Sequence, residues 1–152
     1  MGKTEEFQSA FSDCVLKIIA SNILFRNELE DTDMRSGMSS LEALATIQIS
    51  ANRRIGHTTA LFEASRAFFK KPLFIFPSSS QREFFIREKG VSSSFCHVSS
   101  DLKGSAGYAL RSRDAILVDN ASYIRGEDME NIKRISQDMY NVNKNFCFIL
   151  IG

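Results

Sequence analysis

Short apolar segments alternate with longer segments of helical periodicity throughout residues 44–152, and this alternation constrains the fold more than any other feature of the sequence. The short segments are dense in β-branched and aromatic residues, which is typical of buried strands. Strands that alternate with helices predict a mostly parallel sheet with helices on both faces, and therefore a three-layer α/β fold. The five expected strands are TIQIS (46–50), PLFIF (72–76), FCHVS (95–99), AILVD (115–119) and NFCFILI (145–151).

The segments between these strands carry apolar residues on one face at helical spacing. Helices are therefore expected at residues 58–70, 81–89 and 127–140. Ligands of such sheets bind at the carboxyl ends of the strands, so the residues that follow each strand are the ones with functional interest.

Residues 1–43 are expected to form an N-terminal helix and a connecting loop, ahead of a single α/β domain at 44–152. Apolar residues recur every three or four positions from Thr4, the expected N-cap, to about Asn27. We expect this helix to pack on the edge of the sheet or to serve in association.

Composition excludes several classes of protein. The 152 residues fit one domain, and a formal charge of +1 requires neither nucleic acid nor an anionic membrane as partner. No apolar run approaches the ~18 residues of a membrane span, and the first residues are too polar for a secretory signal. Three widely spaced cysteines fit reduced thiols. We therefore expect an intracellular, cytoplasmic protein without a membrane partner.

The residues after the first expected strand resemble a phosphate-binding loop. Set against G-x-x-x-x-G-K-[ST], Gly56 and Thr58 match, whereas Ala51 and His57 replace the first glycine and the lysine. Backbone N–H groups of such a loop can still face phosphates, but histidine is shorter than lysine and mostly uncharged at neutral pH. An ordinary strand-to-helix turn stays open as an alternative. The candidate nucleotide-binding residues are Asn52, Arg53, Arg54, Gly56, His57, Thr58 and Thr59.

Two further strand ends carry polar residues. Asp119 follows four apolar residues, where a carboxylate would lie beside the loop, so Thr58 and Asp119 are candidate Mg²⁺ ligands. Pro77 is expected to end the strand PLFIF, and Gln81 is expected to open the next helix.

Over roughly residues 44–152, the order of these motifs resembles the first RecA-like lobe of nucleic-acid motor ATPases, in particular helicases and the large subunits of viral and phage terminases. A proline motif with a downstream glutamine is similar to Pro77–Gln81, and an acidic strand motif is similar to Val118–Ala121. The strand that couples hydrolysis to motion in those families is similar to FCFILIG at 146–152.

The resemblance implies a P-loop NTPase-like (RecA-like) domain with Gln81 as a further site residue. It also implies ATP and Mg²⁺ as cofactors, with no other cofactor expected, and nucleic acid as a candidate partner. For a viral protein, the location would be the cytoplasm of the host cell.

Asn120 departs from the family pattern, because it stands where the family has the glutamate that activates the attacking water. An amide cannot act as a base, so the candidate catalytic position is impaired. Together with the lysine lost at His57, this removes the two effects on which phosphoryl transfer mainly depends.

We therefore expect a degenerate P-loop protein that binds nucleotide with weak or absent hydrolysis, as a regulatory or structural subunit with a partner protein or as a homo-oligomer. One alternative is a functioning ATPase in which Glu63, Asp114 or Glu127 replaces the missing glutamate. Another is an interaction module that binds and inhibits a partner without nucleotide.

Overall fold

The structure, a computed structural model, describes residues 3–30, 45–50, 56–102 and 112–152. Three candidate loop residues, Asn52, Arg53 and Arg54, and the replaced glycine position Ala51 lie outside the described residues.

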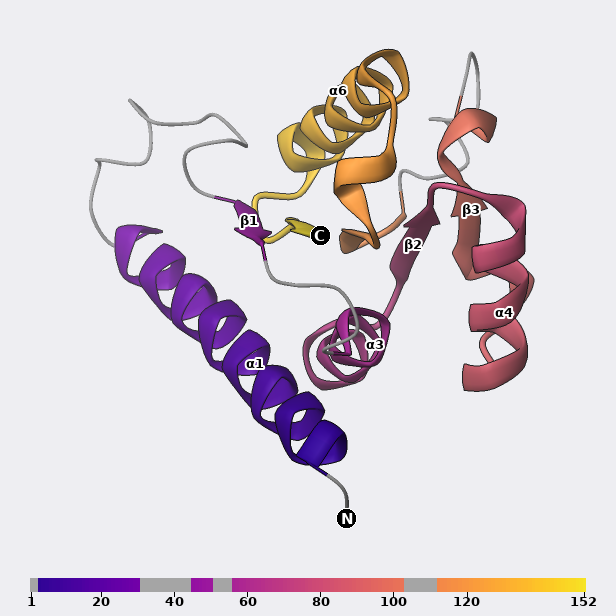
Figure 1. The fold of residues 1–152 in the computed structure, drawn as a ribbon. Helices are drawn as coiled ribbons and strands as arrows, with labels where there is room; N and C mark the ends of the chain where they lie inside the picture. Colours follow the sequence, from indigo (N-terminus) through magenta and orange to yellow (C-terminus); the bar gives the residue numbers. More distant parts are fainter. Residues whose placement is uncertain (1–2, 31–44, 51–55, 103–111) are drawn as a thin grey trace.

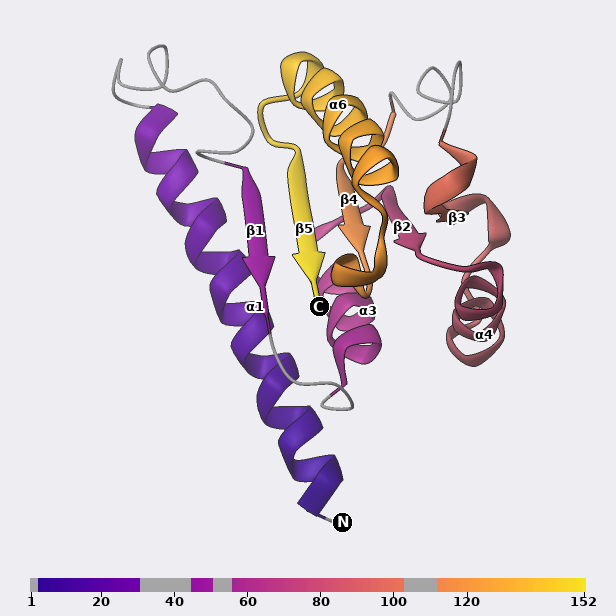
Figure 2. The same ribbon diagram turned by 45° about the horizontal axis from the view of Figure 1, so that its top comes forward.

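The core of the fold is a five-stranded sheet in which every neighbouring pair of strands is parallel (Figures 1 and 2). The strand order is β1-β5-β4-β2-β3. The alternating pattern of the sequence is thereby confirmed as an α/β fold with a parallel sheet. The strands are β1 (Thr46–Ile49), β2 (Pro72–Phe76), β3 (Cys96–Val98), β4 (Ala115–Val118) and β5 (Cys147–Ile151).

The described residues form four α-helices, and the three expected after the first strand begin and end within about two residues of their expected bounds. None of these four helices is both long enough and apolar enough to cross a membrane. Short 3₁₀ turns cover Ser93–Phe95, Ser99–Asp101 and Ala121–Tyr123. The α-helices are α1 (Lys3–Glu30), α3 (His57–Phe68), α4 (Ser79–Lys89) and α6 (Gly126–Val142).

Two helices begin one or two residues before their expected starts. Helix α1 begins at Lys3, so Thr4 lies inside its first turn. Helix α4 begins at Ser79 and not at Gln81, because the Ser78 hydroxyl caps it by accepting a hydrogen bond from the Gln81 backbone N–H at 3.4 Å. A serine followed three residues later by a glutamine is a capping signal that the sequence carried.

The sheet separates two hydrophobic clusters because successive side chains of a strand point to opposite faces. On one face, Phe74 and Leu117 pack with residues of α1, α3 and α4. On the other face, Leu73 and Ile116 pack with residues of α6. Figure 1 shows α6 on one side of the sheet and α1 and α3 on the other, which gives the three layers.

Helix α1 is part of the first of these layers. Val15 and Ile19 are fully buried in the same cluster as the sheet residues. Both views show α1 running beside β1 at the edge of the sheet. The expected packing of the N-terminal helix on the sheet edge is confirmed.

Arg26 connects the carboxyl-terminal half of α1 to the start of β5 through hydrogen bonds. Its side chain is only 4% exposed. The guanidinium donates to the Cys147 Sγ at 3.0 Å, to the Phe146 carbonyl at 2.7 Å and to the Lys144 carbonyl. A buried cation is tolerated when its donors are satisfied, and here all three acceptors belong to the segment that leads into β5.

We predict that Arg26→Met lowers the free energy of unfolding by about 2–4 kcal/mol. The substitution removes three hydrogen bonds donated by a charged group and leaves two carbonyls without that donor. Urea unfolding followed by circular dichroism measures the change. The control is Arg134→Met on the exposed face of α6. Equal losses in the two variants would contradict the role assigned to Arg26.

Candidate functional site

The carboxyl ends of β1, β4 and β5 lie together, as parallel pairing requires (Figure 2). We call this end of the sheet the carboxyl edge. Strand β1 precedes the loop that leads to α3, and Asp119 directly follows β4. At the end of β5, the Gly152 N–H donates to the Ile49 carbonyl at 3.0 Å. The start of α3, Asp119 and Gly152 therefore lie at the same edge of the sheet.

A short hydrogen bond joins two of the predicted site residues. The Thr58 Oγ1 in the first turn of α3 donates to the Asp119 Oδ2 at 2.6 Å. Asp119 is 2% exposed, so this bond lies in a largely desolvated environment. Hydrogen bonds to an ionised oxygen are short and strong, and this one connects residues 61 positions apart in the chain.

Burial raises the pKa of Asp119 above its ordinary value. The Thr58 hydrogen bond, the nearby imidazole of His57 and the Asn120 backbone N–H favour the ionised form but do not offset the burial. The Asn120 N–H donates to the Asp119 Oδ1 at 3.0 Å. Asp119 is thus a carboxylate whose ionised form would gain from a neighbouring cation.

Asn120 and Gln81 are brought together by the fold. The Asn120 Nδ2 donates to the Gln81 Oε1 at 3.0 Å, so an amide from the end of β4 contacts an amide from the first turn of α4. Asn120 has a φ of 50°, a left-handed conformation that asparagine tolerates better than most residues. Both amides are predicted site residues, and their contact could not be inferred from spacing.

Gly152 lies directly against this turn. Its φ is 127°, and a Cβ at this position would lie 2.9 Å from the Asn120 Cα. Only glycine allows the end of β5 to approach the turn so closely. The glycine that ends the apolar run FCFILIG was the available signal of this close approach.

The side chain of His57, at the start of α3, is buried. Its side chain is 7% exposed, and its ring lies 5.4 Å from the ring of Phe11 in α1. Its Nε2 is buried and has no hydrogen-bond partner among the described residues. The preceding Gly56 has a φ of 93°, and a Cβ there would lie 3.1 Å from the Gln8 Cγ of α1. Helix α1 therefore covers the position where the motif has its lysine.

Thr59, Glu63 and Glu127 have no described contact with Asp119 or Asn120. The Thr59 Oγ1 accepts a hydrogen bond from the Lys89 Nζ of α4 at 3.3 Å. Glu63 and Glu127 are exposed on α3 and on the first turn of α6. Neither carboxylate has a described contact with Asp119 or Asn120.

Asp114 lies at the opposite end of the sheet. It precedes β4, and its carboxylate accepts the backbone N–H groups of Lys70 and Lys71 at 2.7 and 3.1 Å. Asp114 and Asp119 flank the four-residue strand β4 and are five positions apart, a separation of roughly 16 Å. The hypothesis that Asp114 replaces the missing glutamate is therefore wrong, because the two residues lie at opposite ends of β4.

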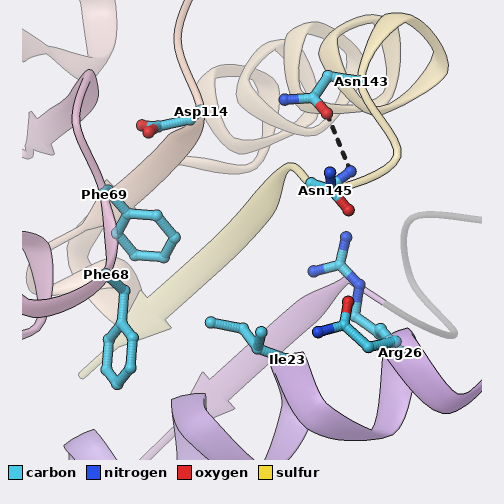
Figure 3. Close-up of a pocket in the computed structure, with 8 residues that line it drawn as sticks. Ile23, Arg26, Phe68, Phe69, Asp114, Asn143 and Asn145 are labelled. Carbon is cyan, nitrogen blue, oxygen red and sulfur yellow. Dashed lines mark hydrogen bonds between the residues drawn. The ribbon is translucent and has the colours of Figure 1, made fainter.

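Asp114 instead lines a cavity of about 330 Å³ near the amino ends of the strands. Figure 3 shows the Asp114 carboxylate and the Arg26 side chain on opposite sides of this cavity, with the ring of Phe69 on the side of Asp114. The lining residues are Ile23, Arg26, Asn27, Phe68, Phe69, Asp114, Asn143 and Asn145.

The donor set at the carboxyl edge suits one kind of metal ion. No group of three or more histidine, cysteine, aspartate or glutamate side chains in the described part of the chain could enclose a metal. One carboxylate and one hydroxyl are hard oxygen donors, which fit Mg²⁺, an ion that keeps several waters and is bound partly by substrate phosphates. Thr58 and Asp119 would be its protein ligands.

Comparisons of the chain with protein-family models, with curated proteins and with solved structures found no match. The protein is therefore described by its own architecture, an α/β fold with an all-parallel five-stranded sheet and an N-terminal helix.

We predict that Asp119→Asn stabilises the protein at neutral pH. The raised pKa means that the folded state holds the Asp119 proton more tightly than the unfolded state, so stability falls as pH rises through the interval between the unfolded and folded pKa. An asparagine can accept from the Asn120 N–H through its Oδ1 and donate from its Nδ2 to the Thr58 hydroxyl, without a buried charge. The gain in thermal unfolding midpoint should therefore be larger at pH 8 than at pH 4, and Asp101→Asn on the surface is the control. A gain that does not grow with pH would refute this account.

Proposed function

We propose that this protein binds a nucleoside triphosphate together with Mg²⁺ at the carboxyl edge of the sheet, and hydrolyses it slowly or not at all. The observation that carries the proposal is the 2.6 Å hydrogen bond between the Thr58 Oγ1 and the Asp119 Oδ2. In P-loop proteins, a loop threonine or serine and a strand-terminal aspartate hold the magnesium ion.

The position of this pair supports a phosphate site. Thr58 lies in the first turn of α3, where backbone N–H groups without intrahelical partners and the helix dipole favour an anion. Asp119 approaches from β4, on the far side of β5. A Mg²⁺ ion bound here would lie between the triphosphate at the helix start and the carboxylate, and it would offset the cost of the buried charge on Asp119.

His57 supports the same site in a second way. A buried nitrogen without a hydrogen-bond partner costs about 1–3 kcal/mol, and structures that retain one usually have a reason. A phosphate oxygen could supply the partner that the described residues do not. The imidazole would then contact the phosphate in place of the lysine ammonium of the motif.

Weak hydrolysis follows from the residue at the position of the catalytic base. Asn120 cannot accept a proton, and its amide is engaged by Gln81. Among the described residues, the carboxylates considered as substitutes are exposed on helices or, for Asp114, at the opposite end of the sheet. A general base must lie within hydrogen-bond reach of the attacking water, and none of these candidates is placed to do so.

The order of the motifs supports the nucleic-acid-motor type of P-loop protein, acting as a regulatory or structural subunit with a partner protein. In such a role, the nucleotide would stabilise a conformation and would not drive repeated work. An arginine supplied by a partner would be needed to complete the usual catalytic set.

We predict micromolar binding of a non-hydrolysable ATP analogue in the presence of Mg²⁺, measured by calorimetric titration. Thr58→Ala and Asp119→Ala should each weaken binding at least about tenfold, the equivalent of 1.4 kcal/mol. Thr59→Ala is the matched control, because its hydroxyl accepts from Lys89 and is not bonded to Asp119. Absence of binding at millimolar nucleotide, in a folded sample, would overturn the proposal and favour an interaction module.

We also predict that His57→Lys combined with Asn120→Glu raises the rate of ATP hydrolysis well above that of the natural protein. The two changes restore the charge that reaches the phosphates and the base that activates water. Glutamate in the left-handed conformation at 120 should cost about 1 kcal/mol of stability. Phosphate release measures turnover, and the single variants are controls. A double variant that binds nucleotide without turnover would show that more than these two groups is missing.

A further inference from the structure

Helix α1 carries a second apolar face that the fold leaves uncovered. Its buried face includes Val15 and Ile19, both fully buried against the sheet layer. On the outside, however, Ile18 is 40% exposed, Leu24 is 65% exposed and Phe25 is 54% exposed. These are half of the six large apolar side chains that are exposed in the described part of the chain.

The exposed side chains form one continuous face. At about 100° per residue, the residues of this face span about 140° of the helix, opposite the buried stripe. The small residues Ala10 and Ser21 lie along the middle of the face. Leu24 lies on one side of them, and Ile18 and Phe25 lie on the other. Small residues at a helix surface allow a second helix to approach closely. A groove on this face is lined by Ala10, Asp13, Cys14, Lys17, Ile18 and Ser21.

Two opposite charges line the same groove. Asp13 and Lys17 are exposed and lie one helical turn apart. Neither forms an ion pair within the described residues. A face that carries both an acid and a base, one turn apart, is complementary to an inverted copy of itself.

We propose that this outer face of α1 is the interface of a homodimer, with the two α1 helices packed antiparallel around a two-fold axis that crosses the groove midway between Asp13 and Lys17. In this arrangement, Asp13 of each copy faces Lys17 of the other, so the two-fold axis generates two ion pairs. A parallel arrangement in register would instead place like charges opposite each other. In antiparallel packing, the positive end of each helix dipole also lies beside the negative end of the other, which is favourable.

The proposed interface uses none of the residues of the candidate nucleotide site. Phe11, whose ring contacts that of His57, lies at the border of the packing face, about 20° around the helix from Ile18 and about 90° from the middle of the face. The 28-residue helix is about 42 Å long, so the apolar face offers several helical turns of contact. The inference therefore stands apart from the proposed nucleotide site and does not depend on it.

Sedimentation velocity over a range of protein concentrations tests the dimer. The natural chain should sediment with twice the mass of the monomer, and Ile18→Glu should shift it to the monomer mass without changing its circular dichroism. A natural chain that stays monomeric, or an Ile18→Glu variant that stays dimeric, would overturn the proposal. The control is Glu130→Lys on the exposed face of α6, which should remain dimeric.

Charge exchange tests the antiparallel orientation. Asp13→Lys alone and Lys17→Asp alone should each weaken dimerisation at least tenfold, because like charges then meet across the axis. An equimolar mixture of these two variants should recover the dimer, and so should the double variant in one chain. Failure of the double variant to recover the dimer, with both single variants weakened, would rule out the proposed orientation.

Discussion

The parallel pairing of β1 with β5 and of β5 with β4 is the constraint on which the candidate site depends. Because all three strands run in one direction, the end of β1, the carboxylate after β4 and the glycine after β5 lie at the same edge. The intervening β5 separates β1 from β4 enough to place Thr58, at the start of α3, against Asp119. An antiparallel β4 would have moved Asp119 to the edge where Asp114 now lies.

Helix α1 is joined to both ends of this sheet. Near its amino terminus, Phe11 covers the ring of His57, and near its carboxyl terminus Arg26 binds the segment that enters β5. A histidine at position 57 is compatible with this packing, since its flat ring can lie against an aromatic neighbour and gain about 0.5–1.5 kcal/mol. A flexible lysine would lose that contact. The contact of α1 with the start of α3 thus depends on the side chain at position 57.

The site carries groups that do not favour stability. Asp119 is a buried carboxyl with a raised pKa, and the His57 Nε2 is buried without a partner among the described residues. Such groups are costly in a protein interior, and proteins that keep them commonly do so where a ligand or a cation completes the environment. This is the physical reason to look for function at this edge, while the cavity beside Asp114 has hydrogen bonds that already satisfy its carboxylate.

Local pattern was enough to place the strands and helices, because the period of the apolar residues decides which element forms and which side it buries. β2 matched its expected bounds, and β4 ended one residue early, so that Asp119, expected as the last residue of that strand, directly follows it. The order of the strands depended on the tertiary structure, since five apolar strands of similar composition can pair in many ways that no local period distinguishes. The contact of Asn120 with Gln81, the cover of Phe11 on His57 and the removal of Asp114 to the far edge all follow from that order and from the packing of α1. These contacts join residues that are far apart in the sequence. They form only when the sheet and the helices on its two faces are assembled.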